Sequence, residues 1–558
     1  MFERRIRHLK RYREIVTAFS HNGFGFIVKE LGLHKIISLP KRLLVKDQNV
    51  QTKTTGERLR LFLEELGPTF VKMGQMASTR PDLIPSELME ELEKLQDRVS
   101  PFSYEEVKAI VEHELGMAVD ELFREFHETP LGAASIGQVH FAVLQSGEPV
   151  AVKVQRPNIE EIIKTDLEIL QHLAEIAEHR LEWAANYQLV EIIEEFSKAL
   201  LAELDYTVEG RNADRLAKLF EDDPTVQIPQ VYWDYSTKKV LTMEYVEGTK
   251  LNEREELKQR GYDEKMLAQR ITHAILKQII LEGFFHGDPH PGNISALPGE
   301  AIAFMDFGMV GRLSPQMKQH FASLVIAIMR RRSEGVLNAI TKMGIVPDDV
   351  DMQLLQWDID ELREKFDDVP LSQVSLGEAV NDLFAIANRH RIQIPADLTL
   401  LGKTLLTMEQ MVEKLDPELS IVKVAEPFGR QLLKERLSPK SVAEHVYNQW
   451  NEYGDVLTEL PRTLKELTAI TRKGKLPLEL SLPKIERFLN KLDRISNRLS
   501  FSIVLLSFSI IMVGLIIGSA LGGQSSLLWN IPAVEIGFVV ALLMFIWLLY
   551  SILRSGRF

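Results

Sequence analysis

Three polar side chains in the second half of the chain have the types and the spacing that transfer of a phosphoryl group requires. Asp288 and Asn293 lie five residues apart in the segment FHGDPHPGN, and Asp306 follows 18 residues after Asp288. Transfer from ATP needs Mg²⁺, and carboxylate and amide oxygens are ligands that this ion prefers. It also needs a carboxylate beside the attacking hydroxyl or water. We therefore expect Asn293 and Asp306 to hold Mg²⁺ and Asp288 to orient the nucleophile.

Two histidines in the same loop raise zinc binding as an alternative. His286 and His290 have the i,i+4 spacing of two ligands on a helix, but Pro289, Pro291 and two glycines oppose a helix here. The chain contains no HExxH pattern and no cysteine. We therefore expect His286 to bond the backbone of its own loop.

The order of these residues is that of protein kinases, in which a catalytic aspartate, an asparagine five residues later and the aspartate of an Asp-Phe-Gly tripeptide follow one another. Asp306 opens such a tripeptide. Upstream, Lys153 ends the sequence VAVK, which is close to the kinase strand whose lysine holds the α- and β-phosphates. The spacing and order of these positions predict that the chain binds ATP with Mg²⁺.

The segment GAASIGQV, which precedes that strand, follows the kinase phosphate loop GxGxxGxV except at one position. Ala134 stands where the middle glycine is expected. Its methyl group restricts how closely the backbone approaches a phosphate, so we expect the nucleotide to be held differently from the usual kinase manner. The loop positions assigned to nucleotide binding are Gly132, Ala133, Ala134, Ser135, Ile136, Gly137 and Val139.

The predicted elements divide the chain into lobes. Strands are expected around 139–156 and 228–248, with a helical region between them, and the chain after 248 is mostly helical. Glu244 and Val246 lie in the expected hinge, where backbone groups would bind adenine. The fold class is α+β, a protein-kinase-like two-lobed fold. We expect a helical N-terminal extension at 1–120, an N-lobe at 121–247, a C-lobe at 248–430, a helical juxtamembrane region at 431–500 and two transmembrane helices at 501–553.

Two apolar runs near the C-terminus are the expected membrane spans, because each is long enough to cross a hydrocarbon core of ~30 Å. The first, at about 501–523, carries no charge, and the second, at about 533–553, carries only Glu535 near its start. Basic residues flank the pair outside and are lacking in the loop between them, so the positive-inside rule places the large body in the cytoplasm. Glycines at four-residue spacing in the first run permit close packing with the second run or with another copy in a homodimer. The net charge of -13 argues against nucleic acid as a partner.

The combination of motifs resembles the UbiB (ADCK-type) family of atypical kinases. The matching segments, within roughly 50–430, are FVKMGQMASTRPD, GAASIGQVH, VAVKVQRP, ELDYTVEGRN, FFHGDPHPGN and MDFGMVG. The C-terminal hairpin is similar to that of bacterial members, which implies the bacterial cytoplasmic membrane. One departure is Gly132, which stands where the family usually has the first alanine of an alanine-rich loop. This departure leaves open whether ATP or another nucleotide is preferred.

The resemblance assigns Lys72, Gly74 and Gln75 to the family's KxGQ motif, whose helix would cover the active-site cleft. Lys72 and Gln75 also lie on one face of a helix by their spacing. A glycine in the middle of a helix costs about 1 kcal/mol relative to alanine, so another element should pack closely against Gly74. By the resemblance, that element is the cleft.

The resemblance also implies roles for three acidic residues. Glu203 and Asp205 match the family's ExD motif, and Glu209 matches the helix glutamate that pairs with the strand lysine, here Lys153. On a straight helix Glu203 points about 200° away from Asp205. The helix must therefore bend, or different elements must converge, if all three acids reach one site.

The leading functional hypothesis is a membrane-anchored atypical kinase or ATPase that uses Mg-ATP. The resemblance implies a role in isoprenoid quinone biosynthesis, ubiquinone or menaquinone, or in related lipid handling. Membrane lipids or quinone intermediates and other membrane biosynthetic enzymes are the partners that this role implies. One alternative is a small-molecule or lipid phosphotransferase, because HGDxHxxN loops occur in aminoglycoside- and choline-kinase-like proteins. Another is a nucleotide-sensing scaffold without turnover, which the presence of Asp288, Asn293, Asp306 and Lys153 disfavours.

Overall fold

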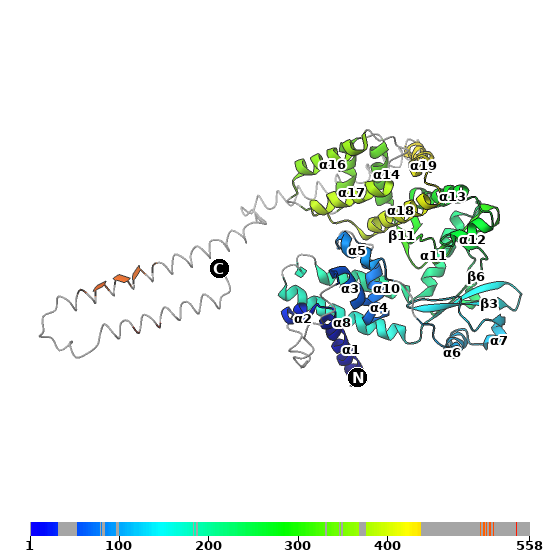
Figure 1. The fold of residues 1–558 in the computed structure, drawn as a ribbon, viewed down its shortest axis with the longest axis horizontal. Coiled ribbons are helices and arrows are strands. Elements are labelled where there is room, and N and C mark those ends of the chain that lie inside the picture. Colours follow the sequence, from blue (N-terminus) through cyan, green and yellow to red (C-terminus); the bar gives the residue numbers. More distant parts are fainter. Residues whose placement is uncertain are drawn as a thin grey trace, which may run out of the picture. The chain divides into compact units, whose positions relative to one another are not determined.

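The computed structural model describes residues 2–436 and scattered positions between 503 and 543. The gaps within the first range are 32–52, 79, 81–83, 96–99, 182–183, 186–187, 330–331, 345, 348–349 and 368–374. The chain divides into two compact units, Met1–Ala443 and Glu444–Phe558. The elements below belong to the first unit and are labelled in Figure 1.

Helices make up the described part of the N-terminal extension. They are α1 (Phe2–His21), α2 (Gly25–Glu30), α3 (Thr55–Leu66), α4 (Pro68–Ala77) and α5 (Ser86–Leu92). Apolar residues of these helices form one buried cluster, which also includes Ile169 of α8 (Ile159–Arg180). Arg11 on α1 also donates a hydrogen bond of 2.6 Å to Asp166 on α8. The extension is therefore joined to the body of the protein through α8.

Within the extension, the segment from Thr55 to Ala77 forms two helices. α3 ends at Leu66 and α4 begins at Pro68, because Gly67 between them has a φ of 91° that ends the first helix. Glycine adopts this conformation without the penalty of a Cβ atom, and proline suits the first position of the next helix. The KxGQ residues consequently lie on a short helix of their own.

Gly74 in α4 packs closely against other helices of the extension. A Cβ atom at this position would lie 2.3 Å from Leu95 Cδ1 and 2.7 Å from Leu63 Cδ1. The prediction of close packing at Gly74 is confirmed. The neighbour implied by the resemblance is wrong, since leucines on α3 and just after α5 approach the glycine instead of the cleft.

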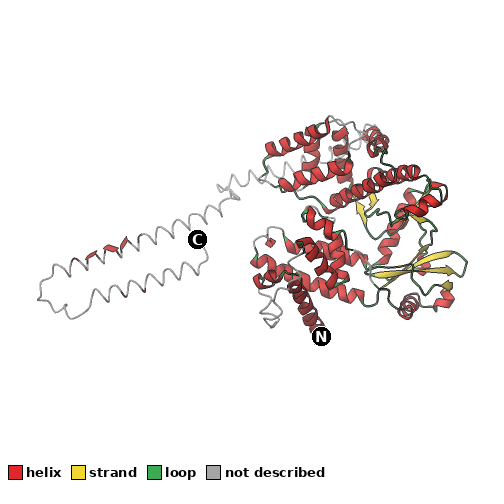
Figure 2. Ribbon diagram, in the orientation of Figure 1, coloured by secondary structure: helices red, strands yellow, loops and turns green. Residues whose placement is uncertain are grey.

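The N-lobe contains an antiparallel sheet, drawn as yellow strands in Figure 2. Its strands are β1 (Phe123–Phe126), β2 (Gly132–Ala133), β3 (Gly137–Leu144), β4 (Pro149–Gln155) and β6 (Val240–Glu244), in the order β1-β3-β4-β6 with β2 beside β3. Alternate residues of β4, Val150, Val152 and Val154, are buried in an apolar cluster with α6 (Tyr104–Leu115) and α7 (Val119–Leu122). Because side chains alternate along a strand, Lys153 faces the other side of the sheet.

Three helices connect β4 to the remainder of the fold: α8, α10 (Leu189–Glu203) and α11 (Tyr206–Leu219). Within this region, expected to be helical, α10 ends at Glu203. Asp205 has extended backbone angles and caps α11 by accepting a 3.0 Å hydrogen bond from the Thr207 N–H. Glu203 and Glu209 therefore belong to different helices, which removes the conflict that a straight helix would create.

The C-lobe places two short sheets among helices. One sheet has the order β5 (Val226–Gln227), β10 (Ile302–Phe304), β9 (Ile294–Ala296) and β7 (Thr249–Lys250), and β8 (Phe284–His286) pairs with β11 (Val310–Arg312). The helices are α12 (Arg254–Gln259), α13 (Glu264–Leu276), α14 (Pro315–Met329), α15 (Ser333–Met343), α16 (Met352–Asp367), α17 (Leu376–Arg389), α18 (Ala396–Leu415) and α19 (Ile421–Arg436). The loop with Asp288 and Asn293 joins β8 to β9, and Asp306 follows β10. These paired strands thus fix both ends of the chemically important loops.

The two apolar runs expected to span a membrane lie outside the described residues, apart from scattered positions, and their membrane insertion stays a prediction. In the described part of the chain, no helix combines the length and the apolar content that crossing a bilayer requires.

Candidate active site

A buried ion pair joins the N-lobe strand to the helix beneath it. Lys153 Nζ on β4 lies 2.9 and 2.8 Å from the two carboxylate oxygens of Glu209 on α11, and 3.9 Å from Asp306 Oδ1. Burial opposes the charge on Lys153, but Glu209 and Asp306 raise the pKa of the lysine above its ordinary value. The lysine is therefore a cation at neutral pH, positioned between both lobes.

Asp306 carries an ionised and partly exposed carboxylate beside Lys153. Lys153 is the main cause that lowers its pKa to about 2, against an opposing contribution from burial, and Lys72 lowers it further. The side chain keeps 54% of its surface exposed, and the Gly308 N–H donates to Oδ1 at 3.2 Å. Its φ of 59° is a left-handed conformation that aspartate tolerates better than most residues. The next residue, Phe307, is fully buried in the apolar core, so the turn leaves Asp306 partly exposed while the Phe307 side chain fixes the turn in place.

The loop between β8 and β9 is held by His286 from within. The ring nitrogen Nε2 lies 3.0 Å from the Met305 carbonyl, and the Asp288 N–H donates to Nδ1 at 3.2 Å. These contacts fit a neutral ring that carries its proton on Nε2. Gln278, in the π-helical turn Lys277–Glu282, accepts a 2.9 Å hydrogen bond from the His286 N–H. The prediction that His286 supports the loop backbone is confirmed.

Asn293 connects the two functional loops. Its side-chain Nδ2 donates to the backbone carbonyl of Asp288 at 3.1 Å, and its backbone carbonyl accepts from the Met305 N–H at 2.8 Å. The amide Nδ2 is occupied in the loop, which leaves the side-chain oxygen as the atom suited to a cation. Asn293 and Asp306 thus carry oxygen atoms of the kind that Mg²⁺ prefers, on two loops that the Met305 N–H joins by its bond to Asn293. Two such residues fit Mg²⁺, which proteins usually hold through one or two side chains together with the phosphates of the substrate.

The tip of the phosphate loop is a buried turn. Gly132 and Ala133 form β2 and pair with β3, the Ala134 N–H donates to the Gly137 carbonyl at 2.8 Å, and Val139 is directly opposite Lys153 in the sheet. Ser135 and Ile136 are buried at the turn. The Ser135 hydroxyl has no hydrogen-bond partner, and neither has the buried Tyr206 hydroxyl. The Tyr206 ring lies 5.2 Å from Lys153 Nζ, so one of these unpaired buried hydroxyls belongs to a residue that borders the lysine.

Gly137 is required by packing as well as by the loop. A Cβ atom there would lie 2.3 Å from the Tyr206 hydroxyl and 2.6 Å from the Val154 carbonyl oxygen. We expect Gly137→Ala to lower the free energy of unfolding by about 1–3 kcal/mol, because neither neighbour can retreat easily. It should also raise the KM for ATP, because the loop must shift.

Gly132→Ala is the matched control, since nothing lies within 4 Å of a Cβ atom at that exposed position. Its unfolding free energy should stay within about 0.5 kcal/mol of the wild type in chemical denaturation. Equal losses for both variants would contradict the packing argument.

The hinge lies between the two sheets. β6 ends at Glu244 in the N-lobe sheet, and β7 begins at Thr249 in the C-lobe sheet, with Val246 in the extended segment between them. The Glu244 carboxylate accepts from Gln227 Nε2 at 2.9 Å and from the Gln230 N–H at 3.2 Å. Glu244 therefore stabilises the hinge through its side chain, and because the Tyr245 N–H donates to the Pro149 carbonyl at 3.0 Å, the backbone of 246–248 is the part that remains for a ligand.

The KxGQ and ExD residues are only partly gathered at the site. Lys72 Nζ lies 3.5 Å from Glu203, and Lys72 contributes to the low pKa of Asp306. Gln75 instead donates to the Leu95 carbonyl at 3.1 Å within the extension. Asp205 caps α11. Lys72 thus acts electrostatically on the site, whereas the side chains of Gln75 and Asp205 form hydrogen bonds with backbone groups.

Sequence reasoning missed Lys403, which the structure places beside Asp288. Its Nζ lies 3.2 Å from Asp288 Oδ1, from the middle of α18. The one sequence signal is indirect: no lysine or arginine stands between Asp288 and Asn293. Asn212 was also missed. It donates to the Phe307 carbonyl at 3.0 Å and accepts from Arg312 Nη2 at 3.0 Å, which fixes the Asp-Phe-Gly turn.

Family models match most of the described chain. They are the ABC1 atypical kinase-like domain at 94–340, the UbiB helical domain at 359–420 and the ABC1/UbiB kinase-like C-terminal domain at 483–554. The two-lobed arrangement of helices and sheets agrees with the kinase-like domain, and the fold is α+β and kinase-like.

Several curated proteins are similar over three quarters of the chain. An uncharacterised protein of Synechocystis, sll1770, is 36% identical over 77% of this chain and 74% of its own length. A probable protein kinase UbiB of Azotobacter vinelandii is 36% identical over 77% and 80%. The chloroplastic protein Activity of BC1 complex kinase 7 of Arabidopsis thaliana is 36% identical over 79% and 64%. The chain belongs to the ABC1/UbiB family of atypical kinase-like proteins.

Proposed function

We propose that the chain is an ATP-dependent atypical kinase or ATPase that acts in isoprenoid quinone biosynthesis at the bacterial cytoplasmic membrane. The observation that carries this proposal is the set of contacts in which Lys153 pairs with Glu209 and lies 3.9 Å from Asp306, while Asn293 bonds both functional loops. Each residue has the type that Mg-ATP chemistry uses at that place. A structural ion pair alone would explain Lys153 and Glu209 but would not require the exposed carboxylate of Asp306.

In the proposed reaction an oxygen atom of water or of an acceptor hydroxyl attacks the γ-phosphorus of ATP. The bond from that phosphorus to the bridging oxygen breaks, and ADP leaves with the electron pair. Asp288 orients the attacking O–H group and accepts its proton, while Lys153 binds the α- and β-phosphates. Mg²⁺, held by Asn293 and Asp306, would supply the positive charge that neutralises the phosphate oxygens.

Water or a small acceptor is favoured over a protein substrate, because the N-terminal extension borders the cleft. Lys72 on α4 helps to lower the pKa of Asp306. Burial raises the pKa of Glu93, which directly follows α5, and the charge of Lys403, beside Asp288, lowers it. A polypeptide substrate would have to displace these helices. The same geometry keeps a lipid phosphotransferase as the second candidate, since a small hydroxyl needs less space.

Membrane anchorage is supported by the two apolar runs at 501–523 and 533–553, and a family model matches 483–554. Quinone intermediates dissolve in the bilayer, so an anchored enzyme would meet them there. Membrane lipids, quinone intermediates and other membrane biosynthetic enzymes are the proposed partners.

The test is release of phosphate from ATP by the full-length protein in liposomes, with and without quinone-precursor analogues. We expect Mg²⁺-dependent hydrolysis that rises when an analogue is present. Transfer of phosphate to the analogue faster than hydrolysis would favour the phosphotransferase. Nucleotide binding without turnover would favour the sensing scaffold, and the lack of any nucleotide binding would refute all three.

A further inference from the structure

A lysine from the helical part of the C-lobe contacts the catalytic loop. Lys403 Nζ lies 3.2 Å from Asp288 Oδ1, although the two residues are 115 positions apart in the chain. Both side chains remain partly exposed, 27% for Lys403 and 39% for Asp288. The ammonium group is therefore at the cleft surface, where a ligand can reach it, and is not a buried counterion.

The loop itself provides no cation of this kind. Between Asp288 and Asn293 stand only two prolines, a histidine and a glycine. Lys153 is held by Glu209 and Asp306, and Lys72 lies 3.5 Å from Glu203. Within the described residues, Lys403 is the basic side chain that the structure pairs with the proposed catalytic carboxylate.

α18 is fixed against the loop around Lys403. A Cβ atom on Gly287 would lie 3.0 Å from Leu400 Cδ2, so the helix and the loop backbone are in close contact. The Thr404 hydroxyl lies 2.9 Å from the Leu400 carbonyl oxygen of its own helix and 3.4 and 3.3 Å from the carbonyl oxygens of His286 and Gly287. One residue on each side of Lys403 thus sets the position of the helix relative to Asp288.

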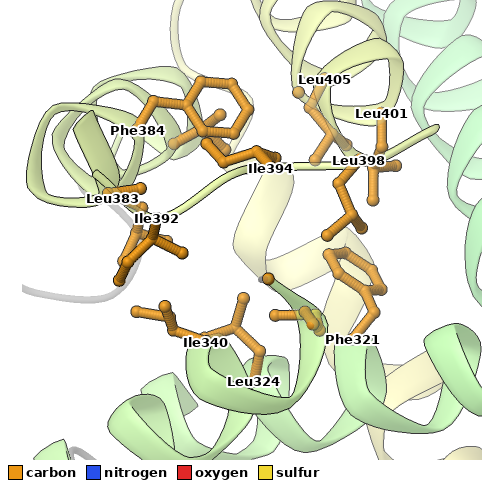
Figure 3. Close-up of a pocket in the computed structure, with 15 residues that line it drawn as sticks. Phe321, Leu324, Ile340, Leu383, Phe384, Ile392, Ile394, Leu398, Leu401 and Leu405 are labelled. Atoms are coloured by element: carbon orange, nitrogen blue, oxygen red, sulfur yellow. The ribbon is translucent and has the colours of Figure 1, made fainter. Parts of the chain in front are cut away.

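The opposite side of the same helix borders an apolar cavity. Leu398, Leu401 and Leu405 of α18 line it with residues from α14, α15 and α17, and its volume is about 90 Å³ (Figure 3). The labelled side chains that surround it consist of carbon alone. Lys403 therefore points away from this cavity, where its charge would be unsolvated, and toward Asp288.

We propose that Lys403 is a catalytic residue that binds the transferred phosphoryl group. In the nucleotide-free site it pairs with Asp288, and when ATP is bound its ammonium group donates hydrogen bonds to the γ-phosphate oxygens. This contact places a positive charge between Asp288 and the phosphate, two anions that would otherwise repel each other. It also stabilises the charge on the equatorial oxygens as the bond to ADP breaks, while the proton of the nucleophile still goes to Asp288.

The inference rests on the proposed function, and the test separates the two. ATP hydrolysis and the Kd of a non-hydrolysable ATP analogue are measured for the full-length protein in liposomes. The variants are Lys403→Met, Lys403→Arg and the control Lys414→Met, which removes an exposed lysine from the last turn of the same helix. Thermal unfolding of every variant is measured in parallel.

We expect Lys403→Met to lower kcat about 100-fold, as loss of one transition-state donor does elsewhere, with the Kd of the analogue changed less than about threefold. Lys403→Arg should recover at least about a tenth of the wild-type kcat, because guanidinium also binds phosphate. Lys414→Met should match the wild type. If Lys403→Met does not unfold cooperatively, Lys403→Gln is judged by the same criteria.

A kcat for Lys403→Met within about threefold of the wild type would overturn the inference, provided that the wild type hydrolyses ATP and Asp288→Asn does not. A parallel loss of kcat and analogue binding, equal in the methionine and arginine variants, would also overturn it in favour of a positioning role. A wild type without turnover would instead refute the proposed function.

Discussion

Replacing Asp288 with asparagine is expected to lower the rate of ATP turnover by about 10²- to 10⁴-fold while the protein still binds nucleotide. The amide keeps the shape of the carboxylate and cannot take up the proton of the nucleophile. Binding should survive because Lys153, Asn293 and Asp306, which would hold the phosphates and Mg²⁺, are unchanged. The measurement is phosphate release together with the Kd of a non-hydrolysable analogue.

Glu282→Gln is the control for this variant, since it removes an exposed carboxylate six residues earlier by the same isosteric change. Its turnover should equal that of the wild type. If Asp288→Asn loses nucleotide binding and turnover together, Asp288 is mainly a metal ligand and another group must accept the proton.

Lys153→Met is expected to be the most destabilising single change in the site. It leaves Glu209, whose side chain is only 6% exposed, without its partner, and an unpaired buried charge costs about 3–5 kcal/mol. Turnover should also be lost, because the phosphates lose their cation. Denaturant unfolding of the full-length protein in detergent micelles measures the first effect, and phosphate release measures the second.

The loss of stability in Lys153→Met should depend on pH with a defined sign. Burial raises the pKa of Glu209 above 4.5, and a raised carboxyl pKa contributes stability that is present at low pH and lost as the pH rises. In the wild type, the Asp306 pKa of about 2 contributes stability that is present above 3.8 and lost as the pH falls. As the pH falls from neutral toward 4.5, the Glu209 effect makes the difference between the two proteins smaller, and the Asp306 effect reduces it further only below pH 3.8.

The double variant Lys153→Met/Glu209→Leu provides the control. Replacing a buried ion pair by apolar residues of similar volume is often neutral, so most of the lost stability should return while turnover stays absent. A double variant as unstable as Lys153→Met would show that the cost lies elsewhere than in the unpaired carboxylate.

The position of Lys153 could be predicted from the sequence because a strand imposes a strict alternation. Val150, Val152 and Val154 must share the buried face, and the lysine between them must face the opposite side. The loops with Asp288 and Asp306 were likewise recognisable, since their functional residues are close in the chain. Local periodicity and short spacing are what a sequence records directly.

The break between α10 and α11 could be posed as a problem but not solved from the sequence. The spacing of Glu203, Asp205 and Glu209 shows that a straight helix cannot serve all three residues. Only the structure shows that the helix ends after Glu203 and that Asp205 caps the next one. Capping and straight continuation are close in free energy, so packing of the surrounding helices decides between them.

Lys403 could not be predicted, because the pairing with Asp288 joins elements far apart in the chain. On α18 it stands in the sequence LLGKTLL, where a lysine is normally a solvated surface residue. The packing of Gly74 could likewise be predicted only in part. A close neighbour was foreseeable from a glycine within a helix, whereas the identity of that neighbour depended on how the extension folds.

The cavity behind α18 gives the active site a compressible wall. Hydrostatic pressure favours states of smaller volume, and a void of about 90 Å³ corresponds to a change on the order of 50 mL/mol if it is eliminated. Collapse of the void would draw α18 toward α14 and α17, away from the loop that carries Asp288. Since sub-ångström placement governs phosphoryl transfer, pressure should disturb the alignment of the site at lower values than those that unfold the protein. Within the described residues, the space that pressure can reduce thus lies directly behind the helix that carries Lys403.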